Sequence, residues 1–368
     1  MKKLVCLLLI VAVISSCKTK EPQFVLKCKI AGADSATFIL QERVPGKYVR
    51  LDSAVVTRGE FTLRGTVKYP EMVVLLAKDK RKAVAFFIEN SEISLTGRLD
   101  SLYIAKITGS KTQDEYVTYQ ASLKPFNDRN EKLYKDYNAA ETAGDKAKMA
   151  ELEKTSEQIY NEETAFTRDY VKGHPASYVA PTLLSNLLLD LEANDLETLI
   201  NNLDSAVAKV QIVQELKEQV AVMKTVAIGQ KAPDFTLNDV NGKPVALSSK
   251  IGSKLLLVDF WAAWCGPCRA ENPNVVKVYR EFHNKGFDVF GVSLDKTRED
   301  WVQAIAKDNL TWTHVSDLQY WKSSAAKLFA VSAIPANYLL DEKGTIMAKN
   351  LRGEALYNKV KEVLTVQK

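Results

Sequence analysis

The sequence has no long apolar run and few histidines and cysteines, the usual ligands of zinc. No apolar stretch reaches the roughly 18 residues of a membrane-spanning helix, so no spanning segment is predicted. Only three histidines occur among the 368 residues. His174, His283 and His314 lack the spacing of zinc ligands and are expected to be surface or capping residues. The sequence therefore predicts no metal site.

The chain also lacks a large charge of either sign. The formal net charge is +5, and it falls to +3 if Lys2 and Lys3 leave with a removed leader. Proteins that bind nucleic acids through phosphate contacts usually carry a pronounced basic surface. A chain this close to neutrality gives no electrostatic reason to expect a nucleic-acid partner.

The first residues have the order of an export signal. Lys2 and Lys3 form a basic start, the apolar run Leu4–Ile14 follows, and small residues precede Cys17. This order resembles a bacterial lipobox, which implies a signal peptide over 1–16, a lipidated Cys17 and a polar tether over 17–22. An ordinary secretory leader with a chance cysteine is the alternative. We expect a protein lipid-anchored to a membrane of the cell envelope, facing the periplasm of a Gram-negative bacterium.

Cysteine is too scarce for a framework of structural disulfides. Of the five cysteines, Cys6 would leave with the leader and Cys17 would carry lipid. Three remain, and two of them, Cys265 and Cys268, are separated by two residues. This pair is expected to be a working redox pair, while Cys28 is expected to be a small apolar residue within a strand.

The residue pattern divides the exported chain into three parts. Residues 23–111 contain short β-branched and apolar runs between turn residues, which favours a small antiparallel β sandwich or barrel. Residues 112–225 are rich in Glu, Lys, Ala and Leu, which favours helices. Residues 226–368 alternate strands and helices, beginning with a hairpin at Asn241-Gly242, and are predicted to form an α/β domain. We find no internal repeat.

The chemistry is concentrated around Cys265-Gly266-Pro267-Cys268, between the apolar strand Leu255–Phe260 and a predicted helix. Cys265 would lie where unpaired backbone N–H groups and the helix dipole stabilise a thiolate, the nucleophile of disulfide exchange. Cys268 would lie one turn later, more buried and close enough to attack a mixed disulfide. Pro267 lacks an N–H, which costs little in a first helical turn.

This segment, with its flanking tryptophans, resembles the active site of thioredoxin, and the resemblance runs from about Ile228 to the C-terminus. The motifs Ala232-Pro233-Asp234-Phe235 and Val292-Ser293-Leu294-Asp295 are similar to the TlpA/ResA branch of exported thioredoxin-like proteins. The resemblance implies a thioredoxin fold and a redox-active disulfide with no further cofactor. The chain ahead of it resembles, over 24–109, an uncharacterised β module found in envelope lipoproteins.

Several residue roles follow from the resemblance. Pro273 matches the proline that kinks the active-site helix, and Ile334-Pro335 matches a cis-proline loop that faces the cysteines and pairs with an extended substrate. Asp259 matches a buried carboxylate beneath the second cysteine, a candidate proton acceptor. Thioredoxin pairs that carboxylate with a lysine, whereas the matching strand here reads Phe290-Gly291-Val292. Trp264, Gly266 and Pro267 are expected to shape the substrate face.

These features predict a thiol–disulfide oxidoreductase that reduces disulfides of exported proteins and draws electrons from a membrane donor. Apocytochrome c is a substrate at the level of the family. A thiol peroxidase of the peroxiredoxin (AhpC/TSA) type is one alternative, although no proline or threonine precedes Cys265 as that motif requires. A disulfide isomerase or partner-binding lipoprotein, in which the N-terminal regions form a homodimer, is another.

Overall fold

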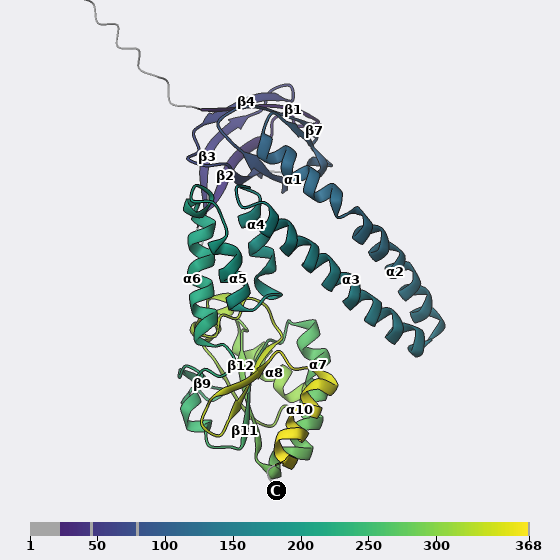
Figure 1. Ribbon diagram of the computed structural model, residues 1–368, viewed down its shortest axis with the longest axis vertical. Coiled ribbons are helices and arrows are strands. Elements are labelled where there is room, and N and C mark those ends of the chain that lie inside the picture. The colour runs from purple at the N-terminus through teal and green to yellow at the C-terminus, as the bar shows by residue number, and fades with distance from the viewer. Residues whose placement is uncertain (1–22, 45–46, 79–80, 367–368) are drawn as a thin grey trace, which may run out of the picture. The chain divides into compact units, whose positions relative to one another are not determined.

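The computed structural model describes residues 23–44, 47–78 and 81–366 (Figure 1). The predicted signal peptide, Cys17 and the tether lie outside these residues. The chain divides into two compact units, Met1–Asp128 and Arg129–Lys368. Within the described ranges, no helix is both long enough and apolar enough to cross a membrane.

The N-terminal strands form two four-stranded sheets. Their orders are β4-β1-β7-β8 and β3-β2-β5-β6. The strands are β1 (Phe24–Ala31), β2 (Thr37–Val44), β3 (Lys47–Val55), β4 (Glu60–Gly65), β5 (Glu71–Ala77), β6 (Lys82–Ile88), β7 (Glu92–Arg98) and β8 (Lys106–Thr108).

Alternating apolar residues build the core of this unit. In β1, Phe24, Leu26, Cys28 and Ile30 are buried, as expected for a strand with one covered face. Burial raises the pKa of the Cys28 thiol to about 12, which suits a packing residue rather than a nucleophile. The prediction of a purely antiparallel module is wrong in one respect, because β1 and β7 pair in parallel. The whole β3-β2-β5-β6 sheet lies between them in sequence, and this long crossover allows the parallel direction.

Helices follow, as the composition predicts. They are α1 (Lys111–Ser122), α2 (Lys124–Ala143), α3 (Lys146–Gly173), α4 (Ala180–Asn186), α5 (Ala193–Asn201) and α6 (Gln211–Thr225). Ser110 caps α1 by accepting a hydrogen bond from the N–H of Gln113, and Asp145 caps α3 in the same way. The leucines of α4 and α5 are mostly buried, whereas α3 exposes much of its surface.

The C-terminal residues form a thioredoxin-like α/β domain around a seven-stranded sheet of order β10-β9-β13-β12-β11-β14-β15. The strands are β9 (Thr236–Asp239), β10 (Pro244–Ala246), β11 (Leu255–Trp261), β12 (Phe287–Ser293), β13 (Thr313–Ser316), β14 (Ala336–Asp341) and β15 (Ile346–Lys349). The helices are α7 (Gly266–Phe282), α8 (Arg298–Asp308), α9 (Ser324–Leu328) and α10 (Gly353–Val366). The predicted three-part architecture is confirmed.

Strand β11 lies in the interior of this sheet, between β12 and β14. All seven of its residues are buried, as in a strand covered on both faces. It pairs in parallel with β12 and antiparallel with β14, so its C-terminal end lies beside the strand that follows Pro335. The sheet therefore brings the segment before Cys265 and the segment after Pro335 to the same edge.

Candidate active site

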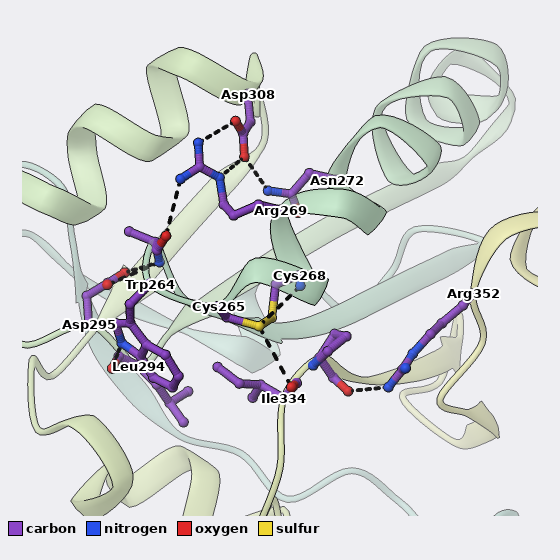
Figure 2. The surroundings of a disulfide bond; sticks show 12 residues. Trp264, Cys265, Cys268, Arg269, Asn272, Leu294, Asp295, Asp308, Ile334 and Arg352 are labelled. Carbon is purple, nitrogen blue, oxygen red and sulfur yellow. Dashed lines mark hydrogen bonds and ion pairs between the residues drawn. A yellow bond between two sulfur atoms is a disulfide. The ribbon is translucent and has the colours of Figure 1, made fainter. Parts of the chain in front are cut away.

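Cys265 and Cys268 form a disulfide at the start of α7 (Figure 2). Cys265 is the N-cap of this helix, and its sulfur accepts a hydrogen bond from the N–H of Cys268 at 3.1 Å. Gly266 and Pro267 occupy the first turn and are exposed, while Pro273 lies inside the helix. The N–H of Cys268 is thus directed at the sulfur that would carry negative charge after reduction.

Both sulfur-bearing residues are largely covered in the oxidised state. Cys265 retains 4% of its exposure and Cys268 retains 1%. Cys268 is the more buried, in the predicted order, but the margin is small and solvent access to Cys265 is narrower than expected. Little of Cys265 is therefore in contact with solvent while the disulfide is formed.

The loop before β14 lies against Cys265. The Ile334–Pro335 peptide bond is cis, and the carbonyl oxygen of Ile334 lies 3.7 Å from Sγ of Cys265. Arg352 donates a hydrogen bond at 2.6 Å to the carbonyl of Pro335 and so fixes the loop from outside (Figure 2). The backbone around Ile334 is held where a substrate chain bound to Cys265 would pass.

The end of β12 fixes the segment that leads into Cys265. Asp295 accepts hydrogen bonds from the N–H of Ala263 at 3.0 and 3.1 Å and from the hydroxyl of Ser293 at 2.8 Å. The Trp264 indole donates to the carbonyl of Leu294 at 3.3 Å. Burial is the main cause that raises the pKa of Asp295, while its bond from Ala263 opposes the shift. Asp295 is thus a positioning residue for the loop before Cys265.

An ion pair holds the other side of the same loop. Arg269 on α7 binds the carboxylate of Asp308 at the end of α8, with one N–O distance of 2.6 Å. Asn272 donates to the same carboxylate at 2.7 Å, and Arg269 also donates to the carbonyl of Ala263 at 3.2 Å. Because both partners are largely covered, the pair ties α7, α8 and the loop together more firmly than an exposed ion pair would.

Asp259 is a buried carboxylate on β11 with 7% of its surface exposed. Its pKa is raised to about 7, chiefly by burial and secondarily by the charge of Glu271, while the charge of Arg352 acts in the opposite direction. A group with this pKa exchanges protons near neutral pH, which suits the acid–base role that the resemblance to thioredoxin implies.

The strand beside Asp259 explains why no lysine accompanies it. Gly291 on β12 is in register with Asp259, and His314 on β13 is in register with Gly291. A Cβ placed on Gly291 would lie 2.3 Å from Nδ1 of His314, so the imidazole occupies the space above the glycine. The expectation that His314 lies at the surface or caps an element is wrong, because it is buried and pointed into the core. Burial lowers its pKa to about 3, so it is neutral.

No group of three or more His, Cys, Asp or Glu side chains that could hold a metal ion occurs in the part of the chain that the structure describes. Sequence reasoning missed Asp295, Arg269, Asp308 and Arg352 as supports of the site. Asp295 is the last residue of the motif Val292-Ser293-Leu294-Asp295, so its role could have been predicted from the sequence. The other three residues contact parts of the chain that are distant in sequence, and no local pattern indicates their roles.

The fold and this site define a thioredoxin-like domain with a redox-active disulfide. Comparison with known proteins agrees. Residues 228–349 match the AhpC/TSA family, and residues 24–116 match a domain of unknown function (DUF4369). The "Thioredoxin-like protein YneN" of Bacillus subtilis is 37% identical over 121 residues, which cover 32% of this chain and 68% of that protein.

Two further relatives are named for the same chemistry. The "Thiol-disulfide oxidoreductase ResA" of Oceanobacillus iheyensis is 33% identical over 140 residues, covering 37% of this chain and 69% of that protein. The thioredoxin domain of a thiol-disulfide oxidoreductase from Bacteroides vulgatus is 39% identical, with a TM-score of 0.36, and covers 38% of this chain and 99% of that one. The chain belongs to the family of thioredoxin-like thiol-disulfide oxidoreductases, and the predicted resemblance to its TlpA/ResA branch is confirmed.

Proposed function

We propose that this enzyme reduces disulfides of exported proteins in the cell envelope, through Cys265 and Cys268. The observation that supports this most directly is the Cys265 sulfur at the start of α7, which accepts the N–H of Cys268 and faces the carbonyl of Ile334. This arrangement stabilises an attacking thiolate and offers backbone to an extended substrate.

The reaction begins with the reduced pair. The Cys265 thiolate attacks one sulfur of the substrate disulfide, a mixed disulfide forms, and the other substrate sulfur leaves as a thiolate that takes up a proton. The Cys268 thiol loses its proton and attacks the Cys265 sulfur, which releases the second substrate thiolate. Two electrons pass to the substrate, and a dithiol donor must then reduce the Cys265–Cys268 disulfide again.

Asp259 is proposed to receive the proton that Cys268 loses. Its pKa of about 7 allows the carboxylate to be present and to accept a proton near neutral pH. Arg352 and Glu271, which shift this pKa in opposite directions, lie on the segments that flank the site and so adjust the acceptor.

The direction of the reaction is proposed from Gly266 and Pro267. A Gly-Pro dipeptide between the cysteines resembles reducing thioredoxins, whose potential is about −270 mV, well below that of the oxidant DsbA at about −120 mV. In an oxidising compartment a reductase needs a donor, which we propose to be a membrane protein reached from a lipid anchor at Cys17. Apocytochrome c is one candidate substrate. A disulfide isomerase is the alternative form of this proposal, in which the N-terminal unit forms the contact between the two subunits of a homodimer.

Equilibration with glutathione tests the direction. We expect the pair to have a potential near that of thioredoxin and the Cys28→Ala variant to have the same value, because the Cys28 thiol is buried. A potential near that of DsbA would reverse the assignment. The peroxidase alternative, which the AhpC/TSA match makes worth testing, predicts rapid consumption of hydrogen peroxide by the reduced protein; we expect negligible turnover.

A further inference from the structure

An exposed aromatic cluster adjoins the disulfide. Trp264, the residue before Cys265, is 45% exposed, and Trp321 is 40% exposed. The ring centroid of Trp264 lies 5.0 Å from that of Tyr320 and 5.9 Å from that of Trp321. We call these three residues the aromatic patch. Exposed, contiguous aromatic surface is unusual for a soluble domain and marks binding sites.

The patch is held in place by its own segment of chain. Asp317 accepts hydrogen bonds from the N–H groups of Gln319 and Ser324, at 3.2 and 2.9 Å, and so closes the loop that carries the two aromatic residues. Tyr320 has a φ of 56°, a left-handed conformation that residues with a bulky side chain rarely adopt. A conformation of this kind persists where the surrounding structure enforces it, and such positions concentrate at binding sites.

A lysine completes the patch on one side. Nζ of Lys296 lies 4.2 Å from the centroid of the Tyr320 ring, which is a cation–π contact. This contact orients Tyr320 from the segment that follows Asp295, the residue that fixes the loop before Cys265. The patch and the redox pair are therefore positioned by the same end of β12.

Trp321 of the patch also lines a cavity of about 550 Å³ together with Ala330, Val331 and Ser332. Most of the exposed lining is apolar, and charged side chains border it (Glu215, Glu218, Lys322 and Lys327). Val222 of α6 lies on its other wall. Trp321 therefore belongs both to the patch beside Cys265 and to the lining of this cavity. An extended polypeptide bound at Cys265 is long enough to contact both, whereas a compact ligand is not.

We propose that the aromatic patch binds a large apolar or aromatic side chain that lies two or three residues from the cysteine of an extended substrate polypeptide. The enzyme then selects disulfides of unfolded proteins rather than those of small thiols. The proposal rests on the proposed function and names the class of substrate for the same site. In an extended chain each residue advances about 3.3 Å, so a side chain two or three positions from the substrate cysteine reaches the patch.

Reduction of matched substrates tests the proposal. The reduced enzyme is mixed with two oxidised peptides that differ only in a tryptophan or a serine two residues from the cysteine, and with oxidised glutathione. We expect kcat/KM for the tryptophan peptide to be about threefold to tenfold higher, the size of one aromatic contact. Trp321→Ala should remove this preference and leave the rate with oxidised glutathione within about twofold.

Two variants make the result specific. Trp321→Phe keeps an aromatic ring and should retain most of the preference, whereas Tyr134→Ala, which removes an exposed tyrosine of α2, should change nothing. Equal rates for the two peptides in the wild type, or a preference that survives Trp321→Ala, would overturn the proposal. So would an equal loss with all three substrates, which would indicate a structural role. Failure to reduce any of the three by the wild type would instead count against the proposed reductase function.

Discussion

The imidazole of His314 fills the space above Gly291, where a Cβ would lie 2.3 Å from Nδ1 of the ring. Gly291 is also the residue paired with Asp259, and it lies on the strand that matches the one from which thioredoxin supplies a lysine to the buried carboxylate. The β12 strand cannot carry a side chain here unless a buried ring moves. Asp259 therefore has no lysine beside it from this position, and burial dominates its pKa.

Gly291→Ala should destabilise the protein by about 1–3 kcal/mol, the usual cost of overpacking a core. Chemical denaturation followed by tryptophan fluorescence measures the free energy of unfolding. Gly173→Ala is a matched control, since apart from the adjoining backbone of its own helix no described atom lies within 4 Å of its Cβ position. If both substitutions leave the midpoint of unfolding unchanged, His314 does not confine Gly291.

Asp259→Asn should change how stability depends on pH. The folded pKa of Asp259 is raised from 3.8 to about 7, so the folded state holds this proton more tightly than the unfolded state. The contribution of Asp259 to the free energy of unfolding should be greatest below pH 4 and should be lost as the pH rises to about 7. The loss is at most about 4 kcal/mol, and Asn removes it. Urea unfolding of the oxidised protein at pH 5 and pH 8 measures this change in the free energy of unfolding. The same change in the wild type and in Asp259→Asn would contradict the prediction.

The same substitution should separate the two steps of disulfide exchange. Cys268 must lose a proton before it attacks the mixed disulfide, whereas Cys265 already lies at the helix N-terminus. Asp259→Asn is therefore expected to slow release of the mixed disulfide more than its formation between pH 6 and pH 8, about one unit on either side of neutrality. Stopped-flow fluorescence resolves the steps. Wild-type rates for both would make the carboxylate structural only.

Local sequence predicts much of this fold, and its limits have a physical cause. The buried run Leu255–Phe260, the turn at Asn241-Gly242 and the cysteine spacing each predict a structure from neighbouring residues. The parallel pairing of β1 with β7 and the burial of His314 over Gly291 depend on strands far apart in the chain. The residues that hold the site in place also depend on distant parts of the chain. Arg352, for example, reaches the Pro335 carbonyl only when β14 and β15 are paired.

The lipid anchor remains a prediction, because Cys17 lies outside the described residues. Cys17→Ala should release the protein from membranes or block its processing, since the substitution removes the thiol that is predicted to be acylated. Acyl labelling with a radioactive fatty acid and fractionation of the cell envelope measure both effects. Cys28→Ala serves as the control, because that thiol is buried in the core of the N-terminal unit. Unchanged labelling and membrane association of Cys17→Ala would contradict the anchor.

Cys265 and Cys268 should have different tasks in substrate exchange. Cys265 is the N-cap of α7, receives the N–H of Cys268 and faces the carbonyl of Ile334, so it is placed to attack. Cys268 lies one turn later with 1% of its surface exposed, and is placed to resolve. Cys268→Ser should therefore accumulate mixed disulfides through Cys265, visible as slower bands on a non-reducing gel of the native cell envelope. Cys265→Ser should trap almost nothing, and Cys28→Ala should behave as the wild type. Adducts on Cys268 alone would reverse the order of attack while leaving the thioredoxin-like fold unaffected.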